Sequence, residues 1–174
     1  MPRIRLPLLL VLLLAACTLP PAPQIRGDPP RARLVVEQGA DRPVPLLLPA
    51  GLSASEARRV AAELARGVPG LRPRLDPVDI PPSRGAWLVL HPLAAGEEGP
   101  DPACGVPHPR PMAAALLLAL CVDGEEVAAV RVAGADERAL WRAARLLLPD
   151  PRANPRPLRL LPHVEVGISG SFGF

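Results

Sequence analysis

Three cysteines carry the most reactive side chains of this 174-residue sequence. Cys17 follows an apolar run near the start of the chain, whereas Cys104 and Cys121 lie far downstream. A thiol can accept a lipid, form a disulfide or bind a metal ion. Because only Cys17 ends an apolar segment, we expect different chemistry at the two places.

Cys104 and Cys121 are the pair that could form a disulfide. In an oxidising compartment, two cysteines of an exported domain favour a bond. The bond would tie a long loop rich in proline and glycine to the hairpin that follows it. The alternative is a pair of buried or cytosolic free thiols, and either state gives the two residues a structural role.

The acidic pairs and the histidines do not form a catalytic pattern. Asp136-Glu137 stands at an expected helix start, where the helix dipole favours negative charge, whereas a glycosidase pair must face one sugar across a cleft. His91, His108 and His163 lack metal-ligand spacing on one element. We therefore expect no catalytic residue, no metal, no cofactor and no enzymatic activity.

Residues 1–16 have the features of an export signal. Arg3 and Arg5 make its start positive, and an apolar run of eleven residues, 6–16, follows. That run is too short to span a bilayer, which takes about 20 residues. The segment ends in small residues before a cysteine: Leu14, Ala15, Ala16 and Cys17.

This ending resembles the lipobox of bacterial lipoproteins. The resemblance implies that the signal peptidase recognises Leu14, Ala15 and Ala16, and that Cys17 receives the lipid. Two or three acyl chains anchor a protein stably, whereas one chain holds it weakly. The expected location is the cell envelope, with the membrane as a partner through the N-terminal lipid. Thr18 implies the outer membrane, facing the periplasm, in a Gram-negative organism; an ordinary signal peptide is the alternative.

The composition limits the remaining classes of protein. Hydrophobic residues make up 49% of the chain and aromatic residues 2%, so leucine, valine and alanine must build the core. This apolar content is too high for a disordered chain. Without Arg3 and Arg5, 18 basic residues stand against 17 acidic ones. Such a balance gives no electrostatic footprint for nucleic acid, and we expect no nucleic-acid partner.

The chain divides into four expected parts. Residues 1–16 are the signal peptide, and residues 17–31 are the lipidated cysteine and a proline-rich tether of roughly 40 Å. Residues 32–168 form a single α/β domain, and residues 169–174 form a flexible tail rich in glycine and serine.

Local patterns predict two helices. Ser53 and Glu56 have the spacing of a capping box, and the apolar period that follows ends at Gly67. A second helix is expected with Asp136 and Glu137 in its first turn, and it should end at Pro149 and Pro151.

The strands follow from apolar runs and a turn signal. Asp123-Gly124 between two apolar runs predicts a two-residue hairpin, because both turn positions need positive φ. The other strands are expected at Arg33–Glu37, Val44–Leu48, Ala86–Leu90 and about 164–168. Flanking prolines place Val44–Leu48 at an edge. The order predicts an α/β fold of the α+β type: a small, mostly antiparallel sheet with two helices packed on one face.

The same order resembles the small N-terminal α/β domain of β-N-acetylhexosaminidases of glycoside hydrolase family 20, over residues 34–168. The resemblance is carried by an apolar strand, a turn, a valine-rich strand, a helix start and a later strand: Leu116–Val122, Asp123-Gly124, Val127–Val132, Gly134–Leu140 and Leu161–Val166. That domain is non-catalytic, and we expect no counterpart here of the catalytic barrel that follows it in the family. The resemblance therefore implies the fold without the activity.

Two functional hypotheses remain. The first is a membrane-anchored envelope lipoprotein with a binding or scaffolding domain linked to glycan or polysaccharide handling. The second is an accessory lipoprotein subunit of a secretion, pilus or transport complex, with a protein complex as partner and a strand of the tail added to a partner's sheet.

Overall fold

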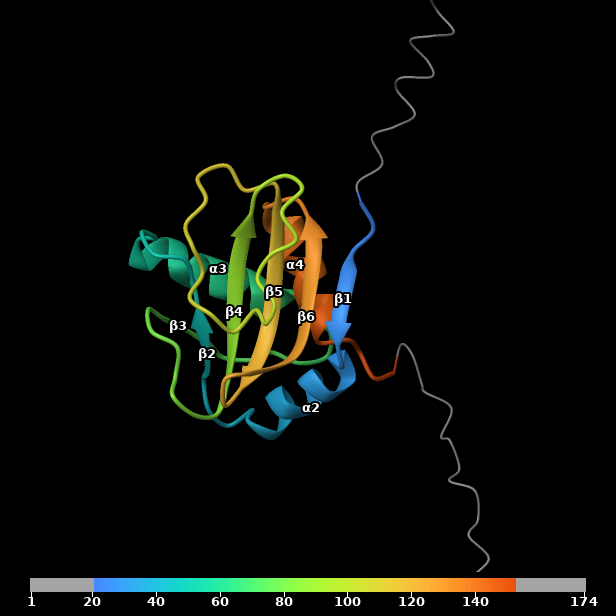
Figure 1. Cartoon of the computed structure of the whole chain (residues 1–174). Coiled ribbons are helices and arrows are strands. Elements are labelled where there is room, and N and C mark those ends of the chain that lie inside the picture. Colours follow the sequence, from blue (N-terminus) through green and yellow to red (C-terminus); the bar gives the residue numbers. More distant parts are fainter. Residues whose placement is uncertain (1–20, 153–174) are drawn as a thin grey trace, which may run out of the picture.

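The computed structural model describes residues 21–152, and these form a mixed sheet with helices packed against it (Figure 1). The strands are β1 (Gln24–Gly27), β2 (Val44–Leu47), β3 (Leu75–Val78), β4 (Ala86–Leu93), β5 (Ala115–Val122) and β6 (Glu125–Ala133). The helices are α2 (Pro29–Gln38), α3 (Ala54–Gly67) and α4 (Glu137–Leu147). The expected signal peptide, Cys17, the strand near 164–168 and the tail lie outside the described residues.

The sheet has the strand order β1-β6-β5-β4-β2-β3. The pairs β1–β6, β5–β6 and β4–β5 are antiparallel, whereas β2 runs parallel to both β3 and β4. This confirms the predicted α/β class and the mostly antiparallel sheet.

The hairpin of β5 and β6 forms as the turn signal predicts. Asp123 and Gly124 have φ values of 51° and 88°, and the Asp123 carboxylate accepts a hydrogen bond of 2.7 Å from the Gly85 N–H. That bond fixes the turn against the segment leading into β4, so that β4, β5 and β6 form the centre of the sheet.

Both predicted helices form, the first at its predicted capping box and the second with Asp136 as its cap rather than in its first turn. The Ser53 hydroxyl accepts from the Glu56 N–H at 3.3 Å, and the Glu56 carboxylate accepts from the Ser53 N–H at 2.8 Å. The Asp136 carboxylate accepts from the Ala139 N–H at 2.8 Å. These bonds satisfy amide groups that the first turn of a helix leaves without partners.

Three helices, rather than the expected two, pack on one face of the sheet. A single buried cluster joins side chains of α2, α3 and α4 to strand residues such as Leu88, Leu118 and Val130. The extra helix arises where a strand was predicted at Arg33–Glu37. That prediction is wrong because Asp28 caps the segment, prolines occupy its first turn, and Arg33 pairs with Glu37 at 2.6 Å one turn later.

The folded domain also begins earlier than predicted. Residues 17–31 were expected to be a tether, yet Gln24–Gly27 form β1 and pair with residues 128–131 of β6. The prolines at positions 29 and 30 open α2 instead of extending a linker. Proline suits both places, because its fixed φ fits an extended tether and the first turn of a helix.

Strand β2 lies inside the sheet rather than at its edge. It pairs with β4 through Leu46 and Leu47, both beyond Pro45, and β3 covers its other side. The edge strand on this side of the sheet is β3, which contains Pro77 and was not predicted from the sequence. A proline donates no ladder hydrogen bond, so an edge position tolerates it.

A long loop, residues 94–114, covers the other face of the sheet. Its Ala103 is fully buried and joins a second cluster with Trp87, Val89, Leu117 and other side chains of that face. Both faces of the central strands are therefore buried, one beneath helices and one beneath the loop. Within residues 21–152, no helix has the length and apolar character needed to cross a membrane.

Candidate functional site

The predicted disulfide joins the loop to the sheet. Cys104 of the loop and Cys121 of β5 are bonded, with their Cα atoms 5.8 Å apart. Cys121 is fully buried beside Trp87 in the loop-side cluster. The bond fastens the middle of the loop over the centre of the sheet, and it confirms the pairing expected from the sequence.

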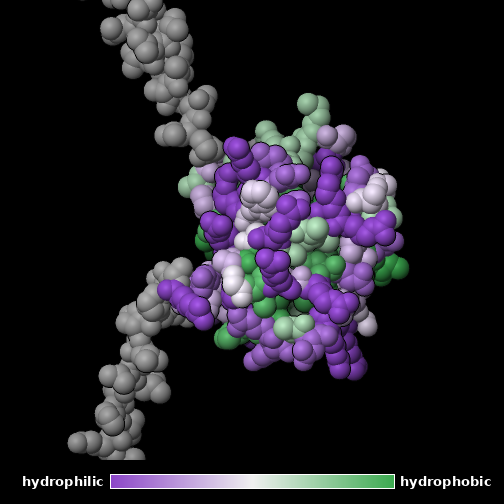
Figure 2. Space-filling model, turned by 180° about the vertical axis from the view of Figure 1, so that it is seen from behind, coloured by the Kyte–Doolittle hydropathy of each residue, from purple (hydrophilic) through white to green (hydrophobic). Residues whose placement is uncertain are grey.

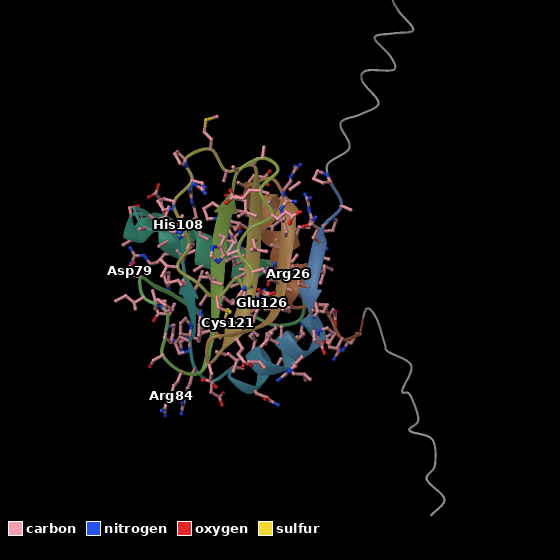
Figure 3. All side chains as sticks on the ribbon, in the orientation of Figure 1. Arg26, Asp79, Arg84, His108, Cys121 and Glu126 are labelled. Carbon is pink, nitrogen blue, oxygen red and sulfur yellow. A yellow bond between two sulfur atoms is a disulfide. The ribbon has the colours of Figure 1, made fainter. Side chains whose placement is uncertain are left out.

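A polar cluster fastens the loop beside the disulfide (Figure 3). The Glu126 carboxylate of β6 accepts a bond of 2.7 Å from the Ala103 N–H and one of 3.0 Å from the Arg26 guanidinium of β1. Arg26 also donates to the Pro100 carbonyl at 3.0 Å. Strand β1 therefore helps to hold the loop. The sequence analysis expected a tether in place of this strand, so it did not predict this contact.

His91 of β4 provides a third attachment. Its buried Nε2 lies 2.8 Å from the Ala103 carbonyl oxygen. A carbonyl only accepts, so Nε2 carries the proton and Nδ1 keeps its lone pair in the neutral ring. Burial lowers the pKa of His91, while the bond to Ala103 opposes this shift. The imidazole is therefore neutral at pH 7 and has a fixed tautomer.

Between the loop and β4 lies a cavity of about 540 Å³, which we call the loop cavity. Polar and apolar residues line it: His91, Pro92, Leu93, Glu97, Pro100, Gly105, Val106, His108 and Arg110. The size falls within the range of small-molecule sites, which combine apolar walls with a few placed polar groups.

Glu97 supplies the charge at the rim of the loop cavity. Its carboxylate accepts from the Ala94 N–H at 2.8 Å and from the Arg110 guanidinium at 3.2 Å. The hydrogen bond from the Ala94 N–H is the main cause that lowers the pKa of Glu97, and the bond from Arg110 adds to it. The carboxyl group is therefore ionised at neutral pH. The rim therefore offers an acceptor and a cationic donor side by side, with His108 nearby (Figure 3).

The loop cavity combines apolar walls with a carboxylate, a guanidinium and two imidazoles. The loop cavity brings together two of the three histidines that the sequence analysis considered, although no spacing along the chain indicated it. In the described part of the chain, no three His, Cys, Asp or Glu side chains are grouped to hold a metal ion. Cys104 is engaged in the disulfide.

The acidic pair Asp136-Glu137 lies elsewhere, at the exposed start of α4. Asp136 caps this helix through the Ala139 N–H, which agrees with the predicted role of its charge at a helix start.

The fold and site define a small, disulfide-linked α/β domain with a cavity between its long loop and β4. No protein-family model, curated protein or solved structure matches the chain. The likeness to bacterial lipoproteins and to the hexosaminidase N-terminal domain therefore stays a prediction from the sequence.

Proposed function

We propose that this protein is a lipoprotein of the cell envelope, anchored through Cys17, whose domain binds a ligand rather than catalysing a reaction. The observation that carries the proposal is the Cys104–Cys121 disulfide. Disulfides persist in oxidising compartments and are rare in the cytosol. The disulfide therefore supports export of the protein. The lipobox-like run that ends at Cys17 is the segment that would direct this export.

The anchor holds the domain near the membrane. Because β1 begins at Gln24, six residues lie between Cys17 and the sheet, so seven residue-to-residue steps connect the two. A fully extended chain of that length spans at most about 24 Å. The domain therefore meets ligands close to the membrane surface, facing the periplasm in a Gram-negative cell.

The ligand that best fits the loop cavity is a segment of envelope glycan. Sugar hydroxyls need both donors and acceptors, which Arg110, His108 and Glu97 provide. The apolar faces of sugar rings can pack against the walls at Pro100 and Val106. The resemblance to a domain found beside hexosaminidase barrels favours the same class of ligand.

The anchor is tested by the mass of protein extracted from membranes, with Cys17→Ser as the paired variant. We expect a lipid-sized increment on a chain that starts at residue 17, and no increment in the variant. Full-length, unmodified protein in the cytosol would overturn the proposed location.

Glycan binding is tested separately on the mature Cys17→Ser protein, which carries no lipid. Adding peptidoglycan fragments should shift NMR signals of residues lining the loop cavity, and Arg110→Ala should weaken the binding. Arg84→Ala is the matched control, because Arg84 is also exposed but lies at the other end of β4 (Figure 3). Signals that do not move at millimolar fragment would exclude this ligand and leave the anchor standing.

A further inference from the structure

The outer edge of β1 is open. Strand β1 is the last strand of the sheet, and among residues 21–152 it pairs only with β6. Ile25 of β1 and Leu34 of α2 lie 50% and 56% exposed on the helix side of this edge. An open strand edge beside exposed apolar side chains is a template for a further strand.

A groove of about 540 Å³ lies along this edge, between β1, α2 and α4. Its apolar lining comes from Ile25, Pro29, Leu34, Leu146, Pro149 and Pro151. Hydrophobic surface is exposed among hydrophilic side chains on this side of the molecule (Figure 2). We call this feature the β1 groove.

Four charged residues also line the β1 groove: Arg33, Glu37, Arg145 and Asp150. The buried one, Arg33, pairs with Glu37 at 2.6 Å and donates to the carbonyls of Pro69 at 2.7 Å and Pro149 at 3.2 Å. Its charge is therefore compensated by its own surroundings, and the apolar lining is left to contact an apolar segment.

The chain itself supplies a segment of this kind. Pro149 and Pro151 line the β1 groove, so the described chain ends beside it at Arg152. Twelve residues further on, the sequence alternates as Val164-Glu165-Val166-Gly167-Ile168. Twelve extended residues reach about 40 Å, and such a tether gives an effective concentration near the millimolar range.

We propose that Val164–Ile168 adds as a further strand to the outer edge of β1. Five residues match the length of the four-residue β1. The valines and Ile168 then cover Ile25 and Leu34, because alternate side chains of a strand share one face. This inference goes beyond the proposed function and does not depend on the lipid anchor.

Charge fixes the register of the added strand. With the apolar side chains in the β1 groove, alternation places Glu165 on the opposite face of the sheet. That face carries Arg26, whose guanidinium is partly exposed and already pairs with Glu126 and Asp101, and Glu165 would stay in contact with solvent there. A slip by one residue would instead bury Glu165 against Ile25, which the loss of solvation disfavours.

Hydrogen exchange of the full mature chain, with Cys17→Ser to keep it free of lipid, tests the proposal. Amides of 164–168 should exchange at least tenfold more slowly than those of an unstructured chain. Leu34→Asp should abolish this protection. Ile80→Asp is the matched control, because Ile80 is 77% exposed and follows β3 at the opposite edge. Unprotected amides in the parent protein, or equal effects of the two variants, would overturn the proposal.

A photo-crosslinking residue in place of Leu34 identifies the source of the strand. The expected product is an internal crosslink to residues 160–170 at the mass of a monomer. Crosslinks at the mass of a dimer that increase with concentration would show that a second copy donates the strand, and would overturn the intramolecular arrangement.

Discussion

Replacing Cys104 and Cys121 together by alanine should lower the free energy of unfolding by about 3 kcal/mol. The disulfide joins residues separated by 17 positions, and the entropy of closing a loop of that length in the unfolded chain gives this value at 25 °C. In a domain of this size, that loss corresponds to a fall in Tm on the order of 10 °C.

Urea unfolding of three samples measures the effect: the oxidised parent, the parent with reductant, and the double variant. The last two should unfold together at lower urea, and reductant should leave the variant unchanged. Amides of residues 94–114 should also exchange faster once the bond is lost. Equal urea midpoints for the oxidised parent and the variant would refute the reasoning, because Arg26 and His91 would then hold the loop without the bond.

Two further substitutions test the packing and the buried histidine. Gly67→Ala should destabilise by about 1–3 kcal/mol in urea, because the new Cβ would lie 2.7 Å from the Trp141 Cα; Gly39→Ala, with its nearest atom at 3.6 Å, should change little. Burial lowers the pKa of His91 below 6.5, so the unfolded chain binds the proton first and stability is lost as pH falls below 6.5. His91→Gln should flatten this decline between pH 7.5 and 5; an unchanged decline in His91→Gln would contradict the assignment.

Local signals were enough to predict the central hairpin and two helices. Asp123-Gly124 fits a turn that needs two positive φ values, and few other residue pairs do. Ser53 and Glu56 satisfy each other's backbone groups within one turn. In each case the residues that determine the element lie close together in the sequence, so no knowledge of the tertiary contacts was required.

The elements that the sequence did not predict depend on distant contacts. Leu75–Val78 shows little alternation and contains Pro77, and it becomes a strand because β2 pairs along its whole length. Arg33 is buried because its charge meets the carbonyls of Pro69, Leu148 and Pro149. No pattern near Arg33 shows those partners, so a charged residue in a helix core was read as part of a strand.

In the candidate site, too, one feature could be predicted from the sequence, and another depends on contacts between distant residues. Cysteine count and the expected compartment were sufficient to predict the disulfide, whereas the loop cavity was missed. His91 and His108 were compared with metal spacing along one element, but the loop brings them to one cavity from β4 and from a segment beyond the disulfide. The sequence analysis ended the strand at Leu90 and assigned His91 to the loop, whereas β4 continues to Leu93 and buries His91.

Three of the contacts that attach the loop to the sheet lie at two neighbouring residues, while Arg26 and Arg131 also hold the loop at the carbonyls of Pro100 and Glu97. Ala103 is held by Glu126 through its N–H and by His91 through its carbonyl, and Cys104 is bonded to β5. A cavity bordered by a loop fixed at this point is formed before a ligand arrives, so less ordering entropy is lost on binding. Glu126 is also held by Arg26 of β1. The pairing of β1 and the closure of the loop are therefore coupled, and a strand that stabilises β1 from outside should also stabilise the loop cavity on the other face.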